Sequence, residues 1–229
     1  MPMFTLKPFY SDLYYRSQFA RGSFTLVTSF LSIIEKLLIS FPAFGTSLKD
    51  LKLEGGSAGL ADVHLFCGLP KINTVARFYL DRLEIDFKAF NQIGEEAAVD
   101  ITQRAWTIVR NADPEIGLVQ HEVTLDMQAE IIGSSGKEFI ERIVRLPTAF
   151  GEKTTCAVVF NMEGGVGGSD VLWSRVVLDR GLAREGALFC KIICRLDGTA
   201  VSLERAGERA SQFVRDTLRD LGLDLERSS

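Results

Sequence analysis

The sequence feature that most constrains the fold is an internal repeat whose two copies lie 109 residues apart. The motif Glu54-Gly-Gly recurs at that offset as Glu163-Gly-Gly. Apolar positions at helical spacing match at the same offset. Phe30, Leu31 and Ile34 correspond to Phe139, Ile140 and Ile143. Ala97, Ala105 and Val109 correspond to Ala206, Val214 and Leu218. An offset shared by so many positions favours one folding unit present in two copies.

Both copies predict the same order of elements. In the first half, strands are expected near 3–15, 49–54, 60–67 and 75–89, and helices at 23–41 and 94–112. In the second half, strands are expected near 118–131, 153–163, 171–179 and 187–196, and helices at 136–146 and 200–222. The sequence therefore predicts an α+β fold, a tandem duplication of a β-α-β-β-β-α unit. Its units are residues 1–115 and 116–229, and a mainly antiparallel sheet carries helices packed on one face.

In element order, this plan resembles the tandem saddle of TATA-binding proteins and the helix-grip class. The first resemblance implies nucleic-acid binding. The charge of the chain argues against that partner, because 26 Lys and Arg residues stand against 30 Asp and Glu residues, a net charge of -4. Proteins that neutralise many phosphates carry a surplus of basic residues.

The loop 55–59 matches G-x-S-x-G, which places a nucleophilic serine on a strand-to-helix turn in α/β-hydrolases. Here a strand is expected to follow Ser57, and the matching loop 164–168 contains no serine. His64 is too close in sequence for the usual order of a triad, and His121 lies on the apolar face of a strand. A hairpin loop is therefore the favoured interpretation of 55–59, and a serine hydrolase using Ser57 is an alternative.

One polar strand face stands out as a candidate ligand-binding surface. Residues 118–131 alternate strictly, so Glu122, Asp126 and Glu130 point to one side of the strand and the apolar residues to the other. Ligands favour the junctions between folding units, so these three carboxylates are the predicted ligand-binding residues. With two histidines in the chain, the sequence predicts neither a metal site nor a cofactor.

Four cysteines lie in apolar runs and are expected to be buried and unbridged, which predicts a reducing, cytoplasmic compartment. The most apolar stretch, 24–44, is interrupted by charges and proline, so no membrane span is expected. No catalytic constellation is recognisable. The first functional hypothesis is therefore a non-enzymatic binding module that engages a protein partner or a small ligand at the groove or junction between the two halves. A nucleic-acid-binding tandem saddle is the third hypothesis, after the serine hydrolase.

Overall fold

The computed structural model describes residues 4–57, 59–144, 156–165, 168–181 and 183–226. The described strands are β1 (Phe4–Phe19), β2 (Leu51–Glu54), β3 (His64–Leu69), β4 (Thr74–Tyr79), β5 (Arg82–Phe87), β6 (Leu118–Ile131), β7 (Val158–Gly165), β8 (Gly168–Arg180), β9 (Leu188–Asp197) and β10 (Leu223–Leu225). The α-helices are α1 (Phe24–Thr28), α2 (Phe30–Ser40), α3 (Phe90–Ile93), α4 (Glu95–Ala112), α5 (Gly136–Ile143) and α6 (Leu203–Asp220). Short 3₁₀ turns cover Pro42–Phe44, Leu48–Asp50, Leu60–Asp62 and Pro70–Ile72.

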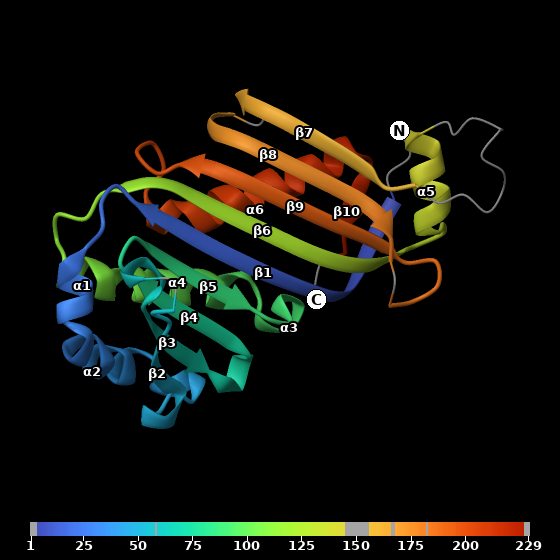
Figure 1. Ribbon diagram of the computed structural model, residues 1–229. Helices are drawn as coiled ribbons and strands as arrows, with labels where there is room; N and C mark the ends of the chain where they lie inside the picture. Colours follow the sequence, from blue (N-terminus) through green and yellow to red (C-terminus); the bar gives the residue numbers. More distant parts are fainter. Residues whose placement is uncertain (1–3, 58, 145–155, 166–167, 182, 227–229) are drawn as a thin grey trace.

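All described strands belong to one sheet with the order β2-β3-β4-β5-β1-β6-β9-β8-β7 (Figure 1). Every neighbouring pair in this order is antiparallel, and only the short β10, which pairs with the start of β1, is parallel to its neighbour. The long strands β1 and β6 pair with each other at the centre and join the two halves of the chain. The predicted α+β class with a large antiparallel sheet is confirmed.

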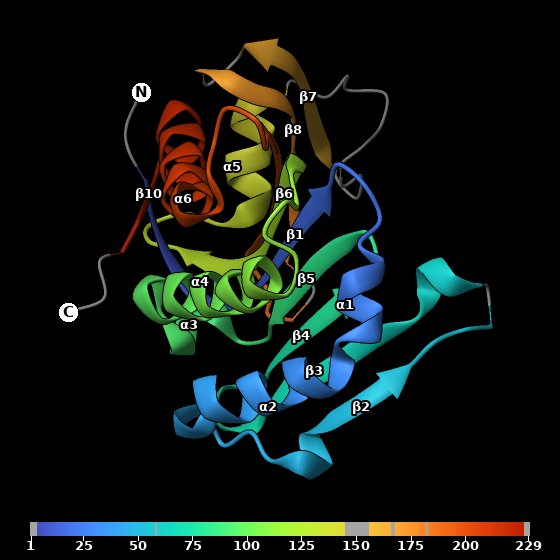
Figure 2. The same ribbon diagram turned by 90° about the vertical axis from the view of Figure 1, so that its left-hand side faces the viewer.

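The helices and the sheet enclose one hydrophobic core on one side of the sheet. Strand burial alternates, as in β9, where Cys190, Ile192 and Cys194 are buried and the residues between them are half-buried or exposed. The helices α4 and α6 lie on this side of the strands (Figure 2), and they bury Ile101 and Phe213 in the same core. We call the side of the sheet away from these helices the open face.

The two halves contribute different numbers of strands to the main order of the sheet, five from the first half and four from the second, whose fifth strand, β10, pairs off this path. The run 75–89, predicted to be one strand, is the hairpin β4–β5, which turns at Leu80 and Asp81. Because each neighbouring pair is antiparallel, the additional strand makes the edge strand β2 run parallel to β1, whereas the opposite edge strand β7 runs antiparallel to β6. The tandem duplication is therefore not confirmed in its predicted form.

The first helices of the two halves also pack differently. The predicted helix 23–41 is broken at Ser29 into α1 and α2, and α2 packs on α4 while α1 contacts β4. In the second half, α5 opens with the predicted capping box of Ser135 and Glu138 and packs on β8 and β9. The remainder of the predicted helix 136–146, after Val144, lies outside the described residues.

Candidate functional site

A single row of side chains crosses the open face from β2 to β7. Its members, each paired in register with the next, are Lys52, Phe66, Arg77, Glu84, Arg16, Glu122, Arg195, Trp173 and Glu163. We call this row the rung. Between its two aromatic residues stand five charged residues of strictly alternating sign. Opposite charges on directly paired positions stabilise the strand register.

At one end of the rung, two cations surround the ring of Phe66. Lys52 Nζ lies 5.8 Å and the guanidinium carbon of Arg77 lies 5.9 Å from the ring centroid. Both distances are within the range of a cation–π contact. We call Lys52, Phe66 and Arg77 the Phe66 cluster. Next to it, Arg82 lies 3.6 Å from the ring centroid of the buried Tyr79, a second contact between a guanidinium group and an aromatic ring in this part of the face.

At the other end, two guanidinium groups lie beside the indole of Trp173. The guanidinium carbons of Arg175 and Arg195 are 5.3 and 5.0 Å from its ring. Arg175 Nε also donates a hydrogen bond of 2.7 Å to Asn161 Oδ1, which orients its planar group. We call Trp173, Arg175 and Arg195 the Trp173 cluster. Trp173 is half-buried, and an aromatic ring with neighbouring guanidinium groups can form a stacking surface for planar, electron-rich groups.

The carboxylates predicted to bind a ligand lie in the central part of the open face and accept hydrogen bonds from cations. Glu122 accepts from Arg195 at 2.6 Å, Asp126 from Lys191 at 3.2 Å, and Glu130 from Arg184 at 2.8 Å. The structure therefore brings all three to one face, as the alternation indicated, but joins each to a basic residue. Their ligand-binding role stays a prediction.

Two ionisable groups at the centre of the open face, the phenol of Tyr14 and the carboxyl group of Asp12, have pKa values shifted in opposite directions. Burial and the nearby carboxylate of Glu84 raise the pKa of Tyr14. Burial raises the pKa of Asp12, but hydrogen bonds from Lys88 and Tyr10 outweigh that effect and leave the pKa below its ordinary value. At neutral pH the phenol of Tyr14 is protonated and Asp12 is ionised. The centre of the face therefore keeps its negative charges.

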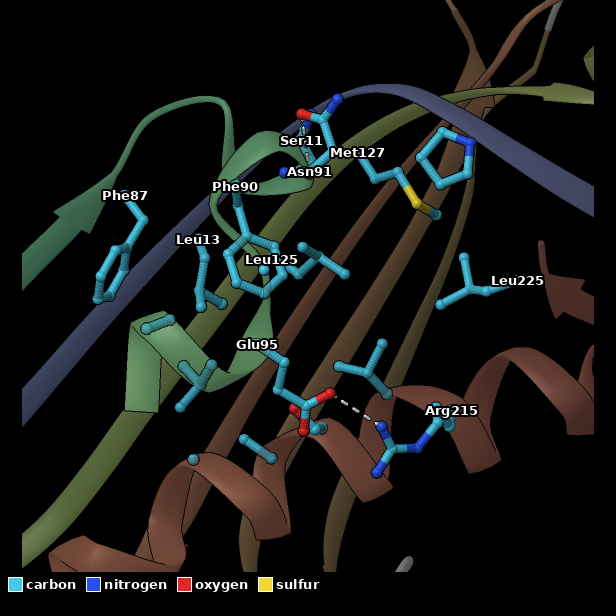
Figure 3. Close-up of a pocket in the computed structure, with 18 of the residues that line it drawn as sticks. Ser11, Leu13, Phe87, Phe90, Asn91, Glu95, Leu125, Met127, Arg215 and Leu225 are labelled. Atoms are coloured by element: carbon cyan, nitrogen blue, oxygen red, sulfur yellow. Dashed lines mark hydrogen bonds and ion pairs between the residues drawn. The ribbon is translucent and has the colours of Figure 1, made fainter. Parts of the chain in front are cut away.

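A cavity of about 410 Å³ lies on the other side of the sheet, between α4, α6, β1 and β6 (Figure 3). Glu95 of α4 and Arg215 of α6 form an ion pair of 3.1 Å beside it. Ser11 Oγ accepts a hydrogen bond from the backbone N–H of Asn91 at 2.9 Å. The apolar part of its lining includes Leu13, Phe87, Phe90, Leu125, Met127, Val214 and Leu225. The cavity offers mainly apolar contact, and the predicted carboxylates of β6 point away from it.

The loop of Ser57 does not have the context of a nucleophilic serine. Ser57 is exposed, and the chain after it passes through a 3₁₀ turn into β3, not into the α-helix that follows the nucleophile in α/β-hydrolases. His64 Nε2 lies 3.7 Å from a carboxylate oxygen of Glu54. Gly55 has a φ of +91°, and a Cβ there would lie 2.0 Å from the backbone oxygen of Asp62. These features are typical of a tight connection between strands, and part of the matching loop 164–168 lies outside the described residues.

His121 is a core residue, as the sequence predicts. It is fully buried, with Nδ1 at 2.9 Å from Ser17 Oγ and 3.1 Å from Tyr15 Oη. Its Nε2 lies 3.0 Å from the backbone oxygen of Val201. Both ring nitrogens therefore have partners inside the protein. Within the described part of the chain, no group of three or more His, Cys, Asp and Glu side chains has the arrangement of a metal site.

Comparison with known proteins identifies no family. No family model matches the chain, and no curated protein matches it. Among solved structures, the chain is similar to the rolling circle replication initiator protein from Geobacillus stearothermophilus, with 10% sequence identity and a TM-score of 0.34. The match covers 93% of this chain and 84% of that one. At this TM-score the likeness supports no argument about the present chain. In the described residues, no helix is long and apolar enough to cross a membrane.

Two predictions from the sequence, one on function and one on partners, are corrected. The first functional hypothesis was a non-enzymatic module for a protein partner or a small ligand, and nucleic acid was taken as an unsuitable partner. The printed name of the structural neighbour, a replication initiator, differs from both predictions, and the correction is supported by the cations gathered beside Phe66 and Trp173. The physical reason for the error lies in the net charge, a property of the whole chain that does not report how cations are distributed on one face.

Proposed function

We propose that the open face of the sheet binds single-stranded nucleic acid. The observation that carries this proposal is the rung, in which Phe66 and Trp173 each lie one position in from opposite ends of one row, with cations beside each ring. Unpaired bases stack on aromatic rings and on arginine planes, and sheet faces with such rings are a common platform for single strands.

The same face suits a duplex poorly. The bases of a duplex are stacked inside it and are not available to rings on a sheet, and a net charge of -4 provides little attraction for its dense phosphates. Three cations of the two clusters, Lys52, Arg77 and Arg175, have no ion pair with a carboxylate in the described part of the protein. Three phosphate contacts correspond to a slope of about -2 in log affinity against log salt for a single strand.

Fluorescence anisotropy with labelled oligothymidylate, an RNA of the same length and a DNA duplex tests the proposal. We expect saturable binding of both single strands, weaker binding of the duplex, and the shallow salt dependence given above. Trp173→Ala should weaken binding, whereas Val159→Ala, which truncates an exposed side chain of the same face in β7, should not. Equal affinity for duplex and single strand, or equal affinity of Trp173→Ala and the intact protein, would count against the proposal.

We also propose that the two predicted units, 1–115 and 116–229, arose from one duplicated ancestor, with one more strand of the main sheet order in the first unit. The offset of 109 residues and the antiparallel pairing of β1 with β6 support this origin. If it is correct, the isolated segment 116–229 retains a pairing edge in β6 and should form a homodimer through that strand. Sedimentation equilibrium of this segment measures its mass, and a stable monomer or an unfolded chain would contradict the proposal.

The cytoplasm is the compartment that we propose for the protein. The four cysteines are free, and three of them are buried in the core. Free thiols are typical of proteins that function under reducing conditions.

A further inference from the structure

The centre of the open face carries more carboxylates than cations. Lys88 Nζ lies 2.9 Å from a carboxylate oxygen of Asp12 and 3.1 Å from one of Asp86, so one ammonium group is shared by two carboxylates. Arg82 lies on β5, between β1 and the Phe66 cluster, and is shared in the same way by two acidic residues. Each of these groups has a net charge of -1. Phosphates that cross the centre of the face would therefore be repelled.

The two ends of the rung carry three cations that are available to a phosphate. Arg16, at the centre of the rung, also has no carboxylate at ion-pair distance in the described residues, but it is half-buried with its Nε enclosed, and its Nη2 donates to Gln18 Oε1. Lys52 and Arg77 lie over Phe66, and Arg175 lies over Trp173 and bonds to a neutral amide. Within the described ranges, no carboxylate pairs with these three cations at ion-pair distance. A cation that is not neutralised by a carboxylate attracts a phosphate more strongly, so the attraction of the face is concentrated in two places.

The two clusters are too far apart for one short oligonucleotide. Phe66 lies on β3 and Trp173 on β8, and six inter-strand steps separate these strands in the sheet order. At about 4.8 Å per step, the path along the rung is about 29 Å. A stacked single strand advances about 3.4 Å per nucleotide, so about nine nucleotides would be needed to span it. A segment of four nucleotides can reach one cluster only.

We propose, on the basis of the function proposed above, that the open face is a bivalent site for nucleic acids with two unpaired segments. One segment stacks on the Phe66 cluster and the other on the Trp173 cluster, while the connecting nucleotides stay off the acidic centre. Once the first segment is bound, binding of the second is intramolecular, and the gain depends on whether the connection can span the two sites. The ligand class is thus a strand with two exposed ends or loops, held apart by a connection of sufficient length.

The test uses the full chain and four ligands of defined length. They are tetrathymidylate, dodecathymidylate, and two tetrathymidylate segments joined by a neutral polyethylene glycol spacer that spans about 30 Å or only about 10 Å. Anisotropy gives the affinities, and calorimetry gives the number of tetrathymidylate molecules bound per chain. The variants are Phe66→Ala and Trp173→Ala, with Val159→Ala as the matched control, and the melting temperature of each is measured first.

We expect two tetrathymidylate molecules per chain, and at least about 100-fold tighter binding of the long-spacer ligand than of tetrathymidylate. The short-spacer ligand should gain little. Each single variant should bind one tetrathymidylate and should bind the long-spacer ligand no more tightly than tetrathymidylate. The stoichiometry of the intact protein decides the question even if a variant does not fold.

Two results would overturn the inference, and they are distinguishable. One tetrathymidylate per chain, with no effect of spacer length, would show a single continuous site and leave the proposed function standing. No binding of any of the four ligands at low salt would overturn both the inference and the proposed function.

Discussion

Trp173 and Arg195 lie directly opposite each other on β8 and β9, with the guanidinium carbon 5.0 Å from the indole ring. The same guanidinium donates a hydrogen bond of 2.6 Å from Nε to Glu122 on β6. The guanidinium group of Arg195 therefore lies beside Trp173 and is hydrogen-bonded to a carboxylate nearer the middle of the rung. Because this hydrogen bond restricts Arg195, the plane beside the indole is oriented before any ligand arrives.

The first prediction concerns the aromatic ring at that end. Trp173→Ala removes a stacking surface worth about 1–3 kcal/mol per base, which corresponds to a loss of about 5- to 150-fold in affinity for a single strand. Trp173→Phe retains a ring and should recover most of the loss. Anisotropy titrations of both variants measure the effect. Equal losses in both variants would indicate that Trp173 acts through folding and not through stacking.

The second prediction concerns the core beneath α6. Phe213 is 3% exposed and belongs to the shared core, as the apolar stripe of the sequence predicted. Phe213→Ala should lower the free energy of unfolding by about 3–5 kcal/mol, because a buried aromatic ring is replaced by a cavity. Urea denaturation monitors the change, with Gln212→Ala on the exposed side of the helix as the control. A loss below about 1 kcal/mol would mean that α6 is not a core element.

The third prediction concerns the ion pair of Asp170 and Arg209, which fastens α6 to β8. Arg209 donates hydrogen bonds from both Nε and Nη2 to the carboxylate. These bonds lower the pKa of Asp170 below its ordinary value of 3.8. The ionised carboxylate thus stabilises the fold fully above the unfolded-state pKa, and this contribution disappears as the pH falls through the lower folded-state pKa.

Asp170→Asn should accordingly lower stability at pH 7, by about 1.5–3 kcal/mol for hydrogen bonds to a charged group. The difference from the intact protein should shrink as the pH falls below 3.8. Urea denaturation at a series of pH values measures both effects, and Glu208→Gln on the exposed side of α6 provides the control. A difference that is independent of pH would contradict this account of the pair.

The fourth prediction concerns the thiols. Burial raises the pKa of Cys67, Cys190 and Cys194 to about 12, and Cys156 is only half-buried. At pH 8 the three buried groups are protonated and shielded, so a thiol reagent should label one cysteine rapidly in the native protein and all four after denaturation. Rapid labelling of three or four thiols in the native state would show that the core around β3 and β9 opens readily.

Local patterns in the sequence predicted the parts of the fold that depend on short-range periodicity. The strict alternation of 118–131 predicted β6 to its last apolar residue, and helical spacing predicted α4 and α6 within a few residues. The hairpin β4–β5 was missed because Leu80 and Asp81 provide no glycine or proline at the turn. The break at Ser29 was missed because apolar spacing continues through it.

The candidate site depends on contacts that no local pattern contains. Trp173 and Arg175 are two residues apart in a predicted strand and share a face, so their proximity could have been recognised. The position of Trp173 opposite Arg195, and the continuation of the row to Phe66, follow from the register of seven strands. Register is set by long-range pairing, which a single sequence does not show.

Indole fluorescence offers the most direct test of the claim that the open face binds single strands. The chain has two tryptophans, and Trp106 is buried in α4 on the opposite side of the sheet, so Trp106→Phe leaves Trp173 as the only emitter. Titration of this variant with dodecathymidylate should quench the emission in a saturable way, with the same affinity as anisotropy reports, because bases stack on Trp173. Binding that leaves the emission unchanged, or no binding at low salt, would contradict the claim.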